Sequence, residues 1–239
     1  MTSPQQAFPL RLTGELDPGV SRWKWLFKWL LAIPHFIVLV FLWIGFVLST
    51  VVAGFAILFT GRYPRRIFDF NVGVLRWSWR VGFYSYSALG TDKYPPFSLA
   101  DDPAYPARLE VEYPERLSRG LVLVKWWLLA IPHYLIVAIF TGGAWSAWGE
   151  GDGFLYATGG GLIGLLVLFA GLALLFTSRY PKALYDFVLG LNRWVFRVAA
   201  YAGLMTDTYP PFRLDNGSQE PPSASDTAAA PSPASATTA

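Results

Sequence analysis

The two histidines of the chain are its first candidates for chemistry. His35 and His133 each follow a proline inside a long apolar run, within the repeated residues Leu-Ala-Ile-Pro-His. Paired imidazoles in a membrane can ligate haem or a metal ion, or relay protons. A proline also leaves a backbone carbonyl without its usual N–H donor, and a nearby histidine can satisfy such local groups. We expect the second role, with separate local contacts and a colourless protein; a bis-histidine haem or metal site is the alternative.

A charged stripe after each apolar run is the second candidate site. Charged residues and one glycine recur there at steps of three and four, and so share one narrow face of a predicted helix: Arg66, Asp69, Gly73, Arg76 and Arg80, then Lys182, Asp186, Gly190, Arg193 and Arg197. A helix that is basic on one side and aromatic on the other is typical of the lipid headgroup layer. The candidates for headgroup binding are therefore Arg62, Arg66, Asp69, Arg76, Arg80, Arg179, Lys182, Asp186, Arg193 and Arg197.

The two aspartates of this set have a simpler explanation. Asp69 lies four residues after Arg65, and Asp186 lies four residues after Lys182. Such i,i+4 pairs on a solvated helix face contribute only a few tenths of a kcal/mol. Ordinary ion pairs are thus the alternative to a headgroup pocket.

Other classes of chemistry find little support in the composition. The chain has no cysteine, which excludes disulfides, thiolate nucleophiles and cysteine-ligated metals. A net charge of +3 gives no reason to expect nucleic acid as a partner. The apolar runs contain no nucleophile–base pair and no carboxylate cluster. We expect a protein that is not an enzyme and has no cofactor.

The elements that must position these residues form two copies of one unit. An apolar run from Trp23 to Thr60 has no charge between Lys28 and Arg62, and KWWLLAIPHY from Lys125 begins a second such run. With 54% hydrophobic and 15% charged residues, the chain reads as an integral membrane protein. The predicted units are 8–99 (the first copy) and 105–214 (the second copy), followed by a disordered Pro/Ser/Ala/Thr-rich tail, 215–239.

Each apolar run is predicted to be a helical hairpin. The histidines of the two copies are 98 residues apart but the Arg-Tyr-Pro motifs are 117 apart, because the second copy carries a glycine-rich, acidic insertion around 142–153. Such an insertion must lie outside the hydrocarbon, so the first run would turn near Trp43–Phe46. The fold class is then all-α integral membrane, with two tandem hairpins, about four membrane segments, and an amphipathic interfacial helix after each hairpin. All Lys and Arg from Arg11 to Arg213 would share one side, which makes this a multi-pass cell-membrane protein with both termini cytoplasmic and Gly149–Gly153 on the far side.

Short cytoplasmic strands are expected at the ends of the copies. Leu109–Tyr113 alternates charged and apolar residues, and Leu10–Leu12 resembles it. We expect these strands to pair with Tyr94–Leu99 or Tyr209–Leu214 and so to close the mouth of each hairpin. The paired prolines of the latter segments favour edge positions.

Several uncommon motifs recur in the same order in both copies. In the first copy these motifs read Leu-Ala-Ile-Pro-His, Leu-Phe-Thr-Gly-Arg-Tyr-Pro, Phe-Asp-Phe, Arg-Trp and Tyr-Pro-Pro-Phe. In these motifs the chain resembles an uncharacterised family of bacterial membrane proteins defined by a domain of unknown function. The resemblance covers 8–99 and 105–214, and it implies no established activity. We expect a non-enzymatic membrane scaffold or accessory subunit that contacts lipids and a protein partner or further copies of itself. A membrane-shaping hairpin protein is the alternative.

Overall fold

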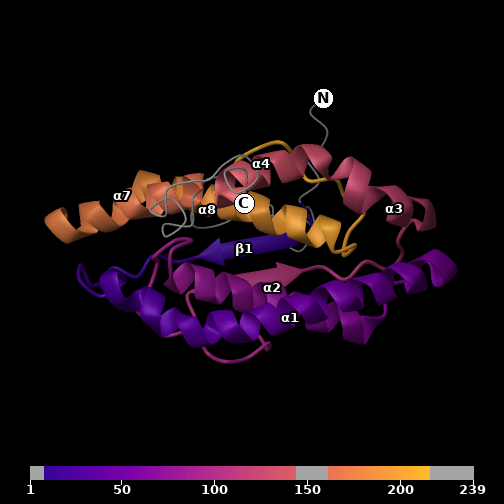
Figure 1. Cartoon of the computed structure of the whole chain (residues 1–239), viewed down its shortest axis with the longest axis horizontal. Helices are drawn as coiled ribbons and strands as arrows, with labels where there is room; N and C mark the ends of the chain where they lie inside the picture. Colours follow the sequence, from indigo (N-terminus) through magenta and orange to yellow (C-terminus); the bar gives the residue numbers. More distant parts are fainter. Residues whose placement is uncertain (1–7, 144–160, 216–239) are drawn as a thin grey trace, which may run out of the picture.

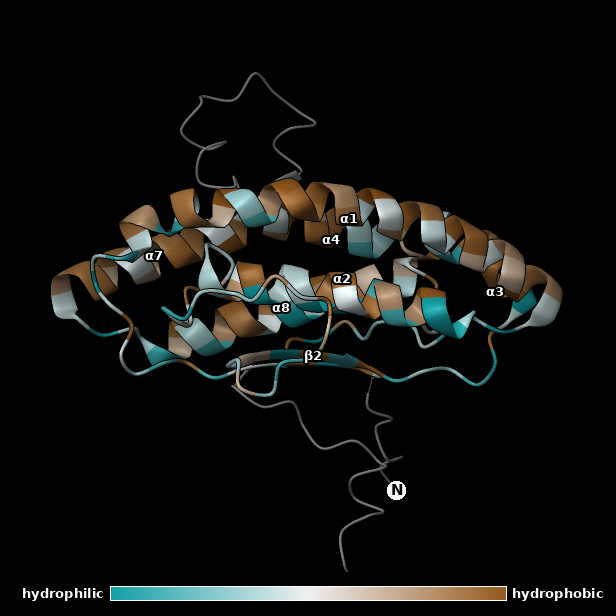
Figure 2. Ribbon diagram, turned by 90° about the horizontal axis from the view of Figure 1, so that it is seen from below, coloured by the Kyte–Doolittle hydropathy of each residue, from teal (hydrophilic) through white to brown (hydrophobic). Residues whose placement is uncertain are grey.

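The computed structural model describes residues 8–143 and 161–215. Its elements are β1 (Leu10–Gly14), α1 (Trp25–Thr60), α2 (Arg65–Tyr84), β2 (Ala107–Val111), α3 (Arg119–Val124), the π-helical η1 (Lys125–Leu129), α4 (Ile131–Thr141), α7 (Leu162–Thr177) and α8 (Lys182–Ala202). They form three layers, as Figure 2 shows: α1, α4 and α7 on one outer side, α2 and α8 in the middle, and the sheet on the other side. Figure 1 shows α1 and α2 on one side of β1, and α4, α7 and α8 on the other.

The first apolar run does not turn. α1 is one helix of 36 residues that continues through Pro34 and through the predicted turn at Trp43–Phe46. The insertion in the second copy marked where that copy tolerates a break, but the first copy has only Gly45 there, and a single glycine costs a helix about 1 kcal/mol without ending it. The predicted turn near Trp43–Phe46 was therefore wrong, and among the described residues the structure does not support about four membrane segments.

By length and composition, α1 is long and apolar enough to cross a membrane. The segments Arg119–Leu129 and Ile131–Thr141 meet the same criterion only as a pair, which is bent by 46°. α7 is shorter, with 16 residues. The predicted far-side loop Gly149–Gly153 and the predicted tail after Asp215 lie outside the described residues.

The two predicted strands exist, but they pair with each other. β1 and β2 are antiparallel, with Leu12 opposite Leu109 and Gly14 opposite Ala107. The alternation of buried and outward residues holds, since Leu10, Leu12 and Leu109 have no exposed surface. The predicted pairing with Tyr94–Leu99 or Tyr209–Leu214 was wrong. Those proline-rich segments pack against the apolar helices instead.

The register reveals a pseudo-two-fold axis between the copies. The motifs that align them make Leu12 equivalent to Leu109, and these two residues face each other in the sheet. On the helical layer above, the equivalent residues Trp79 and Phe196 also meet, with ring centroids 5.7 Å apart. An axis through both pairs runs across the sheet and the helical layers, so each copy contributes equally to both outer sides.

The copies are interlocked by their strands. β2, from the second copy, packs on α2 of the first, and β1 packs on α8 of the second. Arg76 on α2 donates from Nε to the carbonyl of Leu109 at 3.2 Å, and Arg193 on α8 donates from Nε to the carbonyl of Leu12 at 2.9 Å. Each copy therefore lacks part of its own packing without the other.

Beyond their exposed first turns, the helices α2 and α8 are mostly buried, whereas a position in the headgroup layer was predicted. They lie between the sheet and the apolar helices, and Val74, Leu75, Trp79 and Leu189 are fully buried. Aromatic residues on their flanks fill the core rather than the bilayer. An amphipathic pattern fits a buried middle layer as well as a membrane surface, because both need one apolar and one polar environment.

The outer side of α1, α3, η1, α4 and α7 is apolar and uncovered, and we call it the apolar face. Only 17% of the most apolar window of α1 is buried. Figure 2 shows this layer as mostly hydrophobic, with a few pale segments. Its exposed side chains include Phe27, Phe36, Phe41, Val47, Phe55 and Phe59 on α1, Trp126, Leu128, Leu135 and Ile139 on η1 and α4, and Phe169 and Phe176 on α7. Soluble proteins rarely expose so large an apolar area.

Candidate functional site

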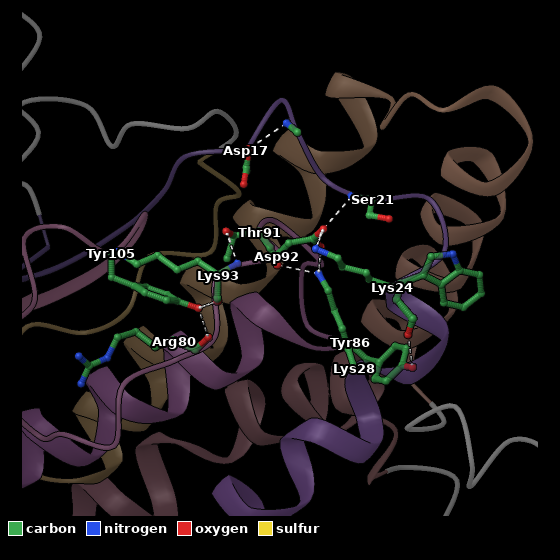
Figure 3. Close-up of polar contacts among 12 residues, drawn as sticks. Asp17, Ser21, Lys24, Lys28, Arg80, Tyr86, Thr91, Asp92, Lys93 and Tyr105 are labelled. Carbon is green, nitrogen blue, oxygen red and sulfur yellow. Dashed lines mark hydrogen bonds and ion pairs between the residues drawn. The ribbon is translucent and has the colours of Figure 1, made fainter.

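A buried lysine near the start of α1 holds the segment that follows α2. Lys28 is 1% exposed, and its ammonium donates to the carbonyl of Thr91 at 2.6 Å and lies 2.9 Å from Oδ1 of Asp92. Asp92 Oδ2 accepts from the backbone N–H of Ser21 at 2.9 Å, and the ammonium also lies 5.0 Å from the centre of the Tyr84 ring. Figure 3 shows Lys28, Asp92 and Ser21 converging. We call this arrangement the Lys–Asp clamp.

The second copy contains the same clamp. Lys125 is fully buried; it donates to the carbonyl of Thr206 and lies 2.8 Å from Oδ1 of Asp207. Asp207 Oδ2 accepts from the backbone N–H of Ser118 at 2.6 Å, and Lys125 lies 5.3 Å from the centre of the Tyr201 ring. The Thr-Asp pair before each Tyr-Pro-Pro-Phe is thus the partner of the lysine before each histidine.

Electrostatics favour a charged Asp92. Burial alone would raise its pKa, but the hydrogen bonds from Lys28 and from the Ser21 N–H, with the charge of Lys24 nearby, outweigh burial and lower the pKa below its usual value. The carboxylate therefore stays ionised at neutral pH. It anchors the chain before α1 to the segment after α2.

The histidines lie about two helical turns beyond the clamp lysines, each in an aromatic enclosure. Trp77 donates its indole N–H to Nδ1 of His35 at 3.1 Å, and the ring of Phe97 stacks on the imidazole with centroids 3.9 Å apart. Tyr94 lies on another side, with its ring centroid 4.9 Å away, and its hydroxyl donates to the carbonyl of Leu31. The imidazole has no exposed surface.

His133 repeats this arrangement in the second copy. Trp194 donates to its Nδ1 at 3.2 Å, Phe212 stacks at 4.4 Å, and Tyr209 lies at 4.8 Å. Because Nδ1 accepts in both rings, the neutral imidazoles carry their hydrogen on Nε2. Neither Nε2 has a hydrogen-bond partner among the described residues. The structure thus places the two histidines in separate enclosures, each with its own tryptophan.

One extra residue separates the lysine and the histidine in the second copy. Lys28 and His35 are seven residues apart, whereas Lys125 and His133 are eight apart. The π-helix η1 takes up the difference, and the N–H of Ala130 reaches the carbonyl of Lys125 at 3.1 Å. A π-bulge is how a helix accommodates a single inserted residue, and it often occurs at functional sites. The π-helix therefore lets Lys125 keep its clamp partners and His133 keep its tryptophan in the second copy.

The candidates for headgroup binding divide into an exposed and a buried group. Arg62, Arg66, Arg179 and Lys182 are exposed, near the ends of the apolar helices. Asp69 and Asp186 pair with Arg65 at 3.1 Å and with Lys182 at 2.5 Å, which is the simple i,i+4 alternative.

The other four candidates point into the molecule. Arg80, Arg193 and Arg197 are buried, and Arg76 is mostly so. Arg80 donates to the carbonyl of Ser98, and Arg197 pairs with Asp215 at 2.7 Å. Together with the bonds of Arg76 and Arg193 to the strands, these contacts fasten loops and sheet to the middle layer. Of the basic candidates, only Arg62, Arg66, Arg179 and Lys182 are therefore exposed at the surface.

The sequence did not show which partners these residues have. The Lys–Asp clamp joins residues more than 60 positions apart, and the histidine partner Trp77 lies 42 positions away. The available signal was repetition itself, since Lys, His, Arg-Trp and Thr-Asp-X-Tyr-Pro-Pro-Phe occur in both copies. Within residues 8–143 and 161–215, no three His, Asp or Glu side chains are grouped so that they could hold a metal ion.

Comparisons with curated proteins and with solved structures gave no match. A family model described as a domain of unknown function, DUF4389, matches residues 22–98 and 153–213. The first segment contains Lys28, Asp92 and the whole histidine enclosure of the first copy, and the second segment contains Trp194 and Asp207. The chain therefore belongs to the DUF4389 family, which is defined by a domain of unknown function.

Proposed function

We propose that the protein is a monotopic membrane scaffold that lies in one leaflet. Its apolar face would be immersed among acyl chains, and the sheet side would face water. In this position it acts without catalysis, as an accessory subunit that presents its polar side to a protein partner or to further copies of itself. The partner class and the absence of an activity are proposals from the same reasoning.

The observation that carries this proposal is the polar lining along the inner side of α1. Polar contacts follow the first two thirds of the helix, from Lys28 with Asp92, through His35 with Trp77 at 3.1 Å, to Ser49 with Asn71 at 2.7 Å. A helix of this length extends about 54 Å, against a hydrocarbon core of about 30 Å. If α1 crossed the bilayer, the middle layer and the sheet would enter it too.

Such an entry would be costly. The outward side of the sheet carries Arg11, Arg108 and Glu110, and backbone groups on its two edges would meet hydrocarbon. An in-plane position leaves all of these groups in water. It also agrees with the pseudo-two-fold axis, which places both copies at the same depth if it runs along the membrane normal.

Basic residues at both ends of the apolar helices support the same orientation. Arg22 precedes α1 and donates to the hydroxyl of Ser178 after α7 at 3.4 Å, so Arg22 and Arg179 lie at one end of the molecule. Arg119 and Arg62 are their equivalents at the other end. Exposed Lys and Arg beside an apolar face attract anionic lipids, by about 1 kcal/mol for each residue near the surface. The excess of basic residues on the aqueous side favours the cytoplasmic leaflet.

Membrane shaping is a second candidate, and the one-sided apolar face favours it. Material inserted in a single leaflet expands that leaflet relative to the other. Vesicles reconstituted at high protein density should then tubulate or shrink, whereas unchanged vesicles favour a scaffold alone. The geometry does not favour a bis-histidine haem protein, because the two imidazoles lie in separate enclosures and each Nδ1 accepts from a tryptophan, which leaves the hydrogen on the Nε2 that would otherwise bind the iron.

Sidedness tests the proposal. The chain has no cysteine, so Ala104→Cys and Asp152→Cys introduce single labelling sites. In sealed, oriented membrane vesicles, an impermeant maleimide should label both positions from the same side. Labelling from opposite sides would show that the chain crosses the bilayer and would contradict a monotopic position. A detergent-solubilised control establishes that both cysteines react when both sides are accessible.

A further inference from the structure

Two grooves open between the apolar helices, one in each half of the molecule. The larger, of about 1430 Å³, lies between α1 and the pair α4–α7; its walls include Trp29, Val40 and Leu168, and its floor is the end of α2 with the residues that follow. The smaller, of about 530 Å³, lies between α1 and α3–η1, above the end of α8. Both belong to the layer that forms the apolar face.

The pseudo-two-fold axis relates these grooves, so their differences can be compared position by position. The offset of 117 residues between the Arg-Tyr-Pro motifs makes Leu168 equivalent to Val51, and Ser85 equivalent to Ala202. In each pair, the first residue lines the larger groove and the second lines the smaller. Before the histidines the offset between the copies is 97 residues, as between Lys28 and Lys125. Trp25, which lines one end of the larger groove, therefore corresponds to Val122 in the smaller groove.

Two serine hydroxyls on the floor of the larger groove already donate to backbone carbonyls of α2. The hydroxyl of Ser85 donates to the carbonyl of Val81 at 2.7 Å, and that of Ser78 donates to the carbonyl of Val74 at 2.8 Å. Ser78 also accepts the indole N–H of Trp43. These two hydroxyls thus add little polarity, and most of the other residues that line the groove are apolar, so the groove suits a hydrocarbon chain better than a polar headgroup.

At one end of the larger groove, Trp25 carries a donor that has no acceptor in the described part of the chain. Its side chain is 7% exposed, and its indole N–H has no hydrogen-bond partner among the described residues. A buried donor without an acceptor is costly, and an acceptor from a bound molecule would remove that cost. Just beyond Trp25 lie Lys24 and the basic end with Arg22 and Arg179, which would attract a negative charge.

We infer that the larger groove binds one anionic phospholipid. Its acyl chain lies between α1 and α7, an ester carbonyl accepts from the Trp25 indole, and the phosphate lies by Arg22 and Arg179. The inference rests on the proposed membrane position, because the groove opens on the apolar face. The smaller groove has Val122 in place of Trp25 and less than half the volume, so it does not retain a lipid in this way.

The test compares matched groove-filling variants. The full chain is reconstituted in vesicles of phosphatidylglycerol and phosphatidylcholine, extracted in mild detergent, and examined by native mass spectrometry. We expect one retained phosphatidylglycerol in the wild type and in Val51→Trp, and at least a tenfold loss of occupancy in Leu168→Trp. Trp25→Phe, which keeps an aromatic ring but removes the donor, should lose about fivefold, as expected for one hydrogen bond. Arg179→Ala should lose the preference for phosphatidylglycerol.

Several results would overturn the inference. Equal retention in Leu168→Trp and Val51→Trp would show that the lipid is not in the larger groove. A wild type that retains no lipid, with the groove occupied by a second copy or by residues 144–160, would do the same. Flotation with vesicles separates this failure from that of the proposed function: a protein that floats but retains no lipid contradicts only the groove, whereas one that does not float contradicts the membrane position itself. Circular dichroism confirms that each variant is folded.

Discussion

The first and second copies hold the same clamp and the same histidine enclosure on different backbones. In the first, a regular α-helix separates Lys28 from His35 by seven residues; in the second, a π-helix separates Lys125 from His133 by eight. The contacts at both ends agree in partner atoms and nearly in length. The comparison teaches that the distance in space between the clamp and the enclosure is constrained. The number of residues and the type of helix between them are not.

Single-residue deletions should break this equivalence most strongly. Deletion of Trp29 from the first copy leaves no surplus residue, so either Lys28 or His35 must leave its partners, and the loss should be about 3–5 kcal/mol as for a broken buried pair. Deletion of Trp126 should convert η1 to α-helix and change stability by about 1 kcal/mol or less. Thermal unfolding in detergent measures both. Equal losses would contradict the role assigned to η1.

Removal of the clamp lysines should come next. Lys28→Met leaves Asp92, 12% exposed, buried without its cation, and we expect a loss of about 3 kcal/mol. Lys125→Met should cost less, because Asp207 is 27% exposed and water can replace the lysine. Denaturant unfolding gives the difference, and Lys24→Met, on an exposed side chain that also lies near Asp92, is the control. A larger loss in Lys125→Met would reverse the predicted order.

The tryptophan donors should have a smaller and equal effect. Trp77→Phe and Trp194→Phe each leave a buried imidazole nitrogen without its donor, at a cost of about 1–2 kcal/mol. Phenylalanine retains most of the packing, so the loss reports mainly on the hydrogen bond. Unequal losses in thermal unfolding would show that the two enclosures are not equivalent. The absence of a Soret band in all these proteins remains a prediction, since nothing in the structure tests colour.

Acid should weaken the first copy through Asp92. The pKa of Asp92 is lowered in the folded state, so its contribution is complete above the unfolded value of about 4 and is lost as the pH falls through the lower folded pKa. Stability of the wild type should therefore fall below pH 4, and Asp92→Asn should flatten this part of the profile. Asp207→Asn, which leaves Asp92 in place, should retain it. An unchanged acid profile in Asp92→Asn would contradict the assignment.

Local patterns predicted the elements well and their partners poorly. The apolar run, the helices that follow it, the two strands and the i,i+4 pairs at Asp69 and Asp186 are read from neighbouring residues, and the structure contains them. The pairing of the strands was wrong because both proline-rich segments and both strands were plausible edges, and only the register places Leu12 opposite Leu109. A twofold arrangement of copies leaves no local signal.

The error about the first hairpin has a related cause. Length and hydropathy alone do not distinguish a helix that crosses a membrane from one that lies along it, and that distinction comes from what lines its inner side. Asn71, Ser49 and Tyr63 are such a lining, but they lie on different elements. The prediction that Arg80 and Arg193 bind headgroups failed for the same reason. In the sequence, a basic stripe has the same pattern whether its side chains contact lipid headgroups or backbone carbonyls.

Depth along α1 is the most direct test of the in-plane position. Single cysteines at Phe27, Phe41 and Phe55, all on the exposed apolar side, carry nitroxide labels, and Glu110→Cys on the sheet serves as the aqueous reference. Accessibility to oxygen and to a water-soluble nickel chelate then reports depth in vesicles. An in-plane helix predicts that all three labels lie at similar depths within one leaflet. A helix that crosses would separate the first and last by about 42 Å along the normal, with the middle label deepest, and that result would contradict the account.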